Sequence, residues 1–244
     1  MGHTQPFFIL GSTGLLLAAL ARATTAPTPE PTALPTPTAP DVQFSIGNIY
    51  WEYNSSANDL GVHVTLDGED WKGLVIEDPN EEILFQVKGR GPYREFGMTE
   101  LFFEGAEPSL DEVPLAELLA KFPEGLYEFS GFTVSGEEIE RIDLLSHAIP
   151  AGPSVSTSLV RGEVLRIHWT PVTTPPPGFP HRPIHITGYQ VIVGSFLVTV
   201  PPSVFTVTVP PEYYRTLAPG VQPYEVLAIE QSGNQTLTEG TFIR

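Results

Sequence analysis

Proline restricts this chain more than any other residue, because it fixes φ and has no backbone N–H to donate. The 244 residues include 26 Pro and 22 Gly. This density, with little helical periodicity, favours an all-β fold of short strands joined by many turns. Cysteine is absent. Disulfide, zinc-thiolate and cysteine-nucleophile chemistry are therefore excluded, and stability must come from packing alone.

The first residues have the layout of an export signal. An apolar run over 7–21 is followed by Ala21-Arg22-Ala23, a small-x-small cleavage pattern. The run is shorter than the ~20 apolar residues that a membrane-spanning helix needs. We therefore expect 1–23 to be a cleaved signal peptide and the mature protein to be secreted, periplasmic or at the cell surface, without stable membrane insertion.

Residues 24–40 alternate Thr, Ala and Pro. Proline at this density prevents both helix and sheet, so this segment is predicted to be a disordered, extended linker or stalk.

Residues 41–150 form a second kind of region, with short strands between clusters of turn-forming residues. The candidate strands are 42–53, 61–66, 72–77, 83–87, 97–103, 126–134 and 139–145. The turns include 54–59, Asp67-Gly68 and Asp78-Pro79-Asn80. One short helix is expected, with Asp111 as its N-cap and Pro123 after its end. The pattern predicts an immunoglobulin-like β-sandwich with one helical crossover.

Residues 151–244 carry a more specific pattern. A strand at 165–169 ends in Trp169, a strand at 186–193 contains Tyr189, and Leu217-Ala218-Pro219-Gly220 precedes a strand that begins at Tyr224. This segment resembles a fibronectin type III domain. The resemblance implies a β-sandwich with a structural core of Trp169, Tyr189, Leu217 and Tyr224, in which the tryptophan packs between the two sheets.

Two residues depart from that family's pattern. Pro223 makes the segment before Tyr224 one residue longer than usual, and Glu230 stands where a small apolar residue is common. The register of this strand matters, because a slip of one residue reverses the buried face.

The negative charge belongs to one region. Between residues 41 and 150, 23 Asp or Glu accompany six Lys or Arg, which accounts for the formal net charge of −17. The remaining charges cancel. This region should repel nucleic acid and anionic membranes, so no nucleic-acid partner is expected.

The acidic residues have two interpretations. They can form a solvated surface that opposes aggregation, or loop carboxylates can bind calcium. The candidate calcium ligands are Asn58, Asp59, Asp67, Asp70 and Asp78. No EF-hand spacing is present, and no other cofactor is indicated.

Aromatic residues offer a second candidate site. Trp51 and Tyr53 share one face of a strand, and Trp71 lies near a turn. Such side chains can form a platform for a sugar ring or a peptide, or they can belong to the core.

Catalytic motifs are absent from the sequence: there is no Gly-x-Ser-x-Gly, His-Glu-x-x-His, P-loop or dinucleotide-binding glycine pattern. His181 and His185 are four residues apart, but Pro180 and Pro183 exclude a helix there. The chain is therefore predicted to be an exported, non-catalytic binding or adhesion module for protein or polysaccharide. The alternatives are a calcium-stiffened spacer at the cell surface and a glycan-processing enzyme that uses paired carboxylates.

Overall fold

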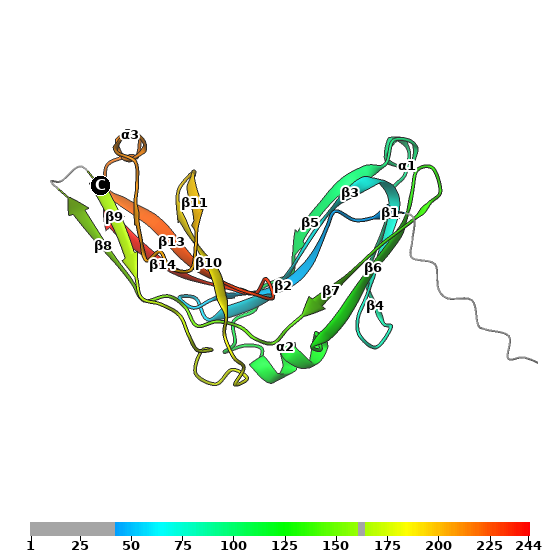
Figure 1. Cartoon of the computed structure of the whole chain (residues 1–244), viewed down its shortest axis with the longest axis horizontal. Coiled ribbons are helices and arrows are strands. Elements are labelled where there is room, and N and C mark those ends of the chain that lie inside the picture. The colour runs from blue at the N-terminus through cyan, green and yellow to red at the C-terminus, as the bar shows by residue number, and fades with distance from the viewer. Residues whose placement is uncertain (1–41, 161–163) are drawn as a thin grey trace, which may run out of the picture. The chain divides into compact units, whose positions relative to one another are not determined.

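The computed structural model describes residues 42–160 and 164–244, and these residues form a mostly β structure (Figure 1). The all-β prediction is confirmed. The predicted signal peptide and the 24–40 linker lie outside the described residues. Within the described ranges, no helix has the length and apolar character needed to cross a membrane.

Seven strands and two helices lie within residues 42–150. They are β1 Val42–Gln43, β2 Ile46–Asn54, β3 Asp59–Glu77, β4 Ile83–Lys88, α1 Pro92–Glu95, β5 Met98–Glu104, α2 Leu115–Lys121, β6 Gly125–Thr133 and β7 Glu138–Leu145. The rest of the chain contributes β8 Val155–Val160, β9 Val164–Trp169, β10 Ile186–Val193, β11 Phe196–Val200, β12 Thr206–Thr208, α3 Pro211–Tyr214, β13 Val221–Glu230 and β14 Gln235–Ile243.

The 19-residue strand β3 organises the first part. Its first half pairs with β2 and β5, and its second half pairs with β4 and β6. The turn predicted at Asp67-Gly68 is therefore wrong, because these residues lie inside β3. The ladder register shifts between Asp67 and Trp71. The chain thus passes from one set of partner strands to another by an irregularity within a strand, as at the corners of β-sandwiches.

The apolar residues of this part form one core. It contains the fully buried side chains of Phe44, Trp51, Trp71 and Tyr127. Helix α2 adds Leu118 to it, as its apolar spacing predicted.

The helix does not begin as predicted, because Pro114 rather than Asp111 is its N-cap. Pro114 has φ −56° and ψ 139°, and this ψ lies outside the helical range, so helical geometry starts only at Leu115. The four-residue helix α1 was not predicted.

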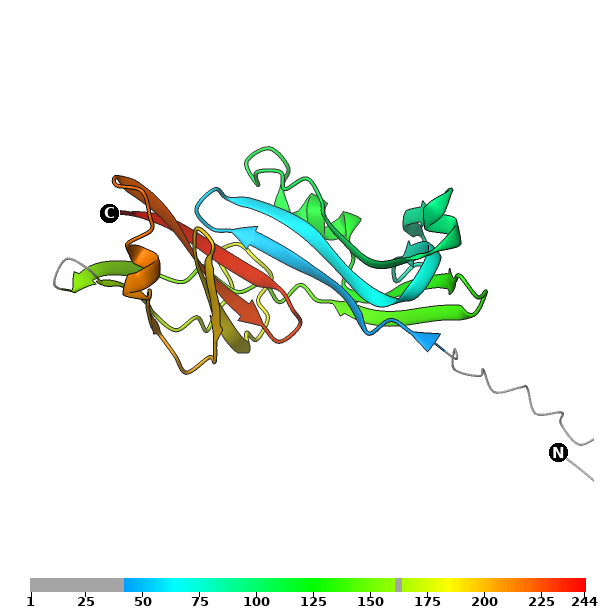
Figure 2. The same ribbon diagram turned by 90° about the horizontal axis from the view of Figure 1, so that it is seen from above.

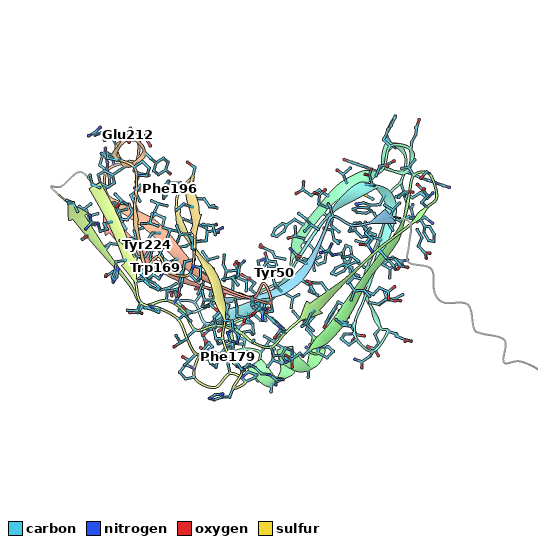
Figure 3. All side chains as sticks on the ribbon, viewed as in Figure 1. Tyr50, Trp169, Phe179, Phe196, Glu212 and Tyr224 are labelled. Carbon is cyan, nitrogen blue, oxygen red and sulfur yellow. The ribbon has the colours of Figure 1, made fainter. Side chains whose placement is uncertain are left out.

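The second part has the strand order of a fibronectin type III-like sandwich. One sheet has the order β12-β9-β8, and β11, β10, β13 and β14 pair in sequence within the other. Trp169, Tyr189 and Tyr224 are buried in one core between these layers, and Leu217 packs against it. Figure 3 labels two members of this core, Trp169 and Tyr224. The ring centroids of Trp169 and Tyr189 are 5.5 Å apart. The core that the resemblance implied is present.

The register of β13 keeps Tyr224 on the inner face. Tyr224, Val226 and Ala228 are buried in the core, while Pro223 is exposed. Glu230 is also buried, and its carboxylate accepts hydrogen bonds from the backbone N–H and hydroxyl of Ser232 and from the backbone N–H of His185. These bonds make a buried carboxylate acceptable where an apolar residue is common.

The two parts share a sheet. β14 pairs with β2 in parallel, Gln235 opposite Glu52 and Leu237 opposite Asn54, so that strands 183 residues apart lie side by side (Figure 2). The pairing produces one 11-stranded sheet. A domain boundary at residue 150 therefore stays a prediction from the sequence.

Side chains also connect the two parts. Asn234 is fully buried, accepts a hydrogen bond from Trp51 N at 2.8 Å, and donates to the carbonyls of Ser146 and Ala148. Phe179, in the loop before β10, packs against Tyr53 with ring centroids 4.9 Å apart. Backbone pairing, buried polar contacts and aromatic packing thus all join them.

Candidate functional site

The three aromatic residues predicted as a binding platform belong to the core. Trp51 is 1% exposed, Trp71 0% and Tyr53 8%. The platform hypothesis is wrong for all three, because none presents a ring face to a ligand. Trp51 and Tyr53 do share one face of β2, and this face points into the core.

The predicted calcium ligands do not come together. Asn58 and Asp59 lie at the start of β3, Asp67 and Asp70 near its middle, and Asp78 just after its end. Among the described residues, no three carboxylates from this set have oxygens close enough to share an ion. The expected convergence of loops fails because 59–77 is one continuous strand.

The last of these residues, Asp78, has a local structural role. Its carboxylate accepts hydrogen bonds from the backbone N–H groups of Asn80 and Glu82 and from the Asn80 side chain. It closes the turn between β3 and β4.

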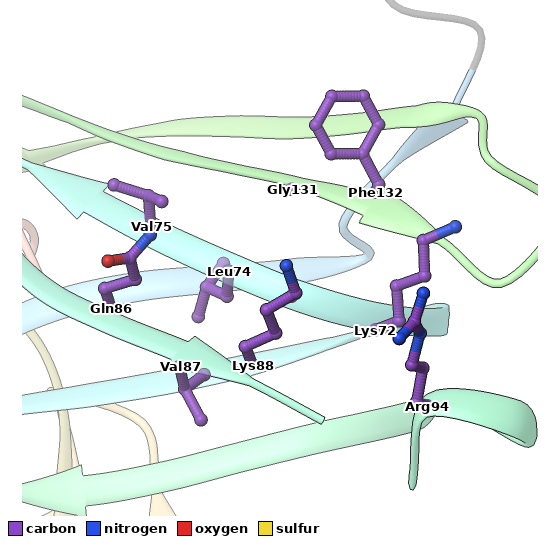
Figure 4. Close-up of a pocket in the computed structure, with 10 residues that line it drawn as sticks. Lys72, Leu74, Val75, Gln86, Val87, Lys88, Arg94, Gly131 and Phe132 are labelled. Atoms are coloured by element: carbon purple, nitrogen blue, oxygen red, sulfur yellow. The ribbon is translucent and has the colours of Figure 1, made fainter. Parts of the chain in front are cut away.

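A different site lies on the outer face of β4, β3 and β6. It is a depression of about 330 Å³ (Figure 4). Its lining includes three cations, one aromatic ring and a polar amide, from Lys72, Lys88, Arg94, Phe132 and Gln86.

Strand register explains the hollow. Lys88 on β4 pairs with Gly73 on β3, and Gly73 pairs with Phe132 on β6. These three residues form one row across the sheet, and paired residues point to the same face. Because Gly73 has no side chain, the middle of the row is open. Lys88 and Phe132 stand on its two sides.

The cations around this depression have no acidic partner. Lys72, Lys88 and Arg94 form no ion pair with any carboxylate in the part of the chain that the structure describes. Lys72 Nζ donates only to the carbonyl of Val134, at 3.4 Å. Arg94 is carried by the short helix α1, after Gly91, whose φ is +54°. Half of the six basic residues in 41–150 therefore gather at one place.

The charge around the depression is asymmetric. Across β6, the next residue in the row is Glu138 on β7, which pairs with Phe132. The positive side is thus limited to β3, β4 and α1, while Phe132 is 52% exposed between it and the acidic side. This arrangement can hold an anionic group beside Lys88 and Arg94 and an apolar ring face against Phe132.

Sequence reasoning missed this site. The signal that could have found it is the position of four of the region's six basic residues within 72–94. Their convergence with Phe132 depends on strand pairing over more than 40 residues.

Within residues 42–160 and 164–244, one group of side chains has the spacing of metal ligands. Glu52, His63 and Glu107 place their ligand atoms within 4.8 Å of one another.

Comparisons with known proteins give remote similarities. No protein-family model and no curated protein matches the chain. Among solved structures, a two-domain fibronectin type III segment of chicken tenascin is 13% identical, with a TM-score of 0.28, 84% of this chain covered and 98% of that one. A bacterial ice-binding adhesin is 11% identical, with a TM-score of 0.28 and 83% and 64% covered. The lipoprotein Tp47 of Treponema pallidum is 8% identical, with a TM-score of 0.34 and 82% and 50% covered.

The chain thus spans less than two thirds of the adhesin and the lipoprotein, and 29% of a Clostridium perfringens spore cortex lytic enzyme, SleM. TM-scores below 0.5 carry no weight for function. The fibronectin type III-like character of the second part rests on its own strand order and core.

Proposed function

We propose that this chain is an exported, non-catalytic binding module that holds an anionic polysaccharide in the depression on β4, β3 and β6. The observation that carries the proposal is the group of three unpaired cations beside an exposed aromatic ring, in a region of net charge −17. Export through the 1–23 signal and display on the 24–40 linker are parts of this proposal.

The charge distribution supports a ligand at this place. Carboxylates outnumber cations almost four to one in residues 41–150, so a basic side chain has many potential partners. Lys72, Lys88 and Arg94 instead line the same open depression. Their mutual repulsion would be relieved by an anionic ligand, and hydrogen bonds between ionised partners are about twice as strong as neutral ones.

The remaining lining residues favour a sugar. Phe132 offers an apolar face of the kind that stacks against a pyranose ring, and the Gln86 amide can donate to and accept from hydroxyl groups. About 330 Å³ is at the small end of ligand sites. The site would therefore hold one or two residues of a longer polymer, and repeated charged units would supply avidity.

The carboxylates that surround the depression would repel anions that approach from solution. At ~0.15 M salt the Debye length is about 8 Å, so repulsion from distant carboxylates is largely screened, while contacts inside the depression are less affected. We therefore expect polysaccharide binding to be weakest at very low ionic strength.

The test is isothermal titration of the full chain with polygalacturonate, with neutral dextran as the comparison polymer. We expect binding to polygalacturonate alone, and the double substitution Lys88→Gln/Arg94→Gln should weaken it by about tenfold or more. Phe132→Ala should weaken it by about three- to tenfold through lost stacking. Lys121→Gln is the matched control, because Lys121 lies on α2 and pairs with Glu117.

Two results would contradict the proposal. One is binding by the double variant that equals that of the unsubstituted chain. The other is equal affinity for polyglutamate, which would show that the depression recognises negative charge alone and not the sugar ring.

A further inference from the structure

A second polar cluster lies on a different face, where β2, β3 and the segment after β5 meet. His63 is 4% exposed, and its Nε2 is 2.9 Å from Oε1 of Glu107. Glu52 completes the group, with a carboxylate oxygen within 4.8 Å of both other ligand atoms. This group is separate from the basic depression, because it belongs to the first half of β3.

The backbone brings these three side chains together. Tyr50 pairs with His63, and Glu52 pairs with Gly61, so all four positions share one face of the sheet. A Cβ on Gly61 would be 2.6 Å from Cγ of Glu107. Only glycine leaves room for Glu107 to cross β3 and reach His63. The Glu107 segment is held there by hydrogen bonds from Gly105 N to Val62 O and from Leu60 N to Pro108 O.

The ligand set has the surroundings that metal sites use. Gln235, on β14, donates a hydrogen bond to the Glu52 carboxylate. The Tyr50 and Phe102 rings flank His63, with centroids 5.3 and 6.1 Å from the imidazole. Such outer contacts fix the orientation of metal ligands.

We infer that Glu52, His63 and Glu107 bind a divalent transition-metal ion of the zinc type. Tetrahedral ligand atoms at 2.0–2.2 Å from zinc are about 3.3–3.6 Å apart. In this group His63 Nε2 and Glu107 Oε1 are 2.9 Å apart, and all three ligand atoms lie within 4.8 Å of one another. One imidazole and two carboxylates suit zinc, whereas calcium requires six to eight oxygen ligands.

The bound ion would act on the connection between the two parts. It would tie β2 to β3 and to the Glu107 segment, and Glu52 is linked through Gln235 to β14. Because β14 pairs with β2 over only three residue pairs, an ion beside this seam would stabilise it. Zinc should therefore raise the thermal unfolding midpoint of the full chain.

The experiment titrates the full chain with Zn²⁺ alone, by calorimetry and by thermal unfolding, and records the visible spectrum with Co²⁺. We expect one ion per chain, a higher unfolding midpoint, and a Co²⁺ spectrum of low coordination number. Glu107→Gln and Glu52→Gln should each weaken Zn²⁺ binding at least tenfold. Both substitutions keep the side-chain size, so circular dichroism and unfolding in the absence of metal should match the unsubstituted chain.

Two control variants locate the ion. Glu128→Gln changes an exposed acid on β6, which pairs with the second half of β3, and His181→Gln/His185→Gln removes the two loop imidazoles. Neither should alter Zn²⁺ affinity. The inference is overturned if the chain binds no Zn²⁺, if Glu107→Gln and Glu52→Gln bind it unchanged, or if the loop histidine variant alone abolishes binding.

Discussion

The two parts of this molecule both consist mainly of β-strands, but their strands are organised differently. In residues 151–244, seven strands form two layers around the core of Trp169, Tyr189 and Tyr224, and acids and arginines balance. In residues 41–150, the single strand β3 pairs with four other strands and the net charge is −17. Both candidate binding sites lie along β3. The regular part thus supplies a scaffold, and the irregular part concentrates the polar chemistry.

The largest loss of unfolding free energy should come from truncating a tryptophan side chain in either core. This loss tests whether the two parts unfold separately. Trp51→Ala and Trp169→Ala each remove a buried side chain and should cost about 3–5 kcal/mol of unfolding free energy. Because the parts share one sheet, we expect a single denaturant transition that both substitutions shift.

The measurement is denaturant unfolding followed by circular dichroism and by tryptophan fluorescence. Two separate transitions, with Trp169→Ala moving only one of them, would show that the shared sheet does not couple the parts.

A smaller effect is expected at the connection itself. Asn234→Ala removes three hydrogen bonds that reach Trp51 N and the carbonyls of Ser146 and Ala148, and it leaves buried polar groups unsatisfied. The expected cost is about 2–4 kcal/mol, with a broader or divided transition. Asn48→Ala is the control, since Asn48 is an exposed residue of β2 and its replacement should change stability by less than about 0.5 kcal/mol. Equal losses of stability in the two variants would show that Asn234 does not couple the two parts.

The smallest change in stability is expected within residues 41–150, and its size depends on pH. Burial acts to raise the pKa of Asp78, but hydrogen bonds from Glu82 and Asn80 outweigh it and hold the pKa below its usual value. A carboxyl with a depressed pKa in the folded state stabilises the fold above its unfolded pKa of about 4, and this contribution is lost as the pH falls below that value. Asp78→Ala should cost about 1–2 kcal/mol at pH 7.

The difference between Asp78→Ala and the unsubstituted chain should narrow below pH 4. Urea unfolding from pH 3 to pH 7 measures it. A difference that stays constant over this range would show that the charge of Asp78 contributes nothing to the turn.

Local sequence patterns predicted the regular part well. The family resemblance carried by Trp169, Tyr189 and Tyr224 implied its sandwich and its core, and these residues do meet, through a regular succession of neighbouring strands. The buried Glu230 was not predictable from its strand, since the Ser232 and His185 groups that satisfy it come from outside β13.

The irregular part was less predictable, for a physical reason. Asp67-Gly68 has the composition of a turn, yet pairing with β5 keeps it in a strand. The basic depression depends on the register of Lys88, Gly73 and Phe132, and the Glu52 cluster depends on the absence of a side chain at Gly61. The composition of a short segment does not determine its register against strands that are distant in the sequence.

The parallel pairing of β2 and β14 has a mechanical consequence. The chain enters β2 from its amino-terminal side, and β14 leads toward the carboxyl end. Tension applied through the chain before β2 and after β14 would pull these neighbours in opposite directions along their length. Their mutual hydrogen bonds would then be loaded together in shear rather than opened one after another, which is the arrangement that best resists a stretching force along the chain.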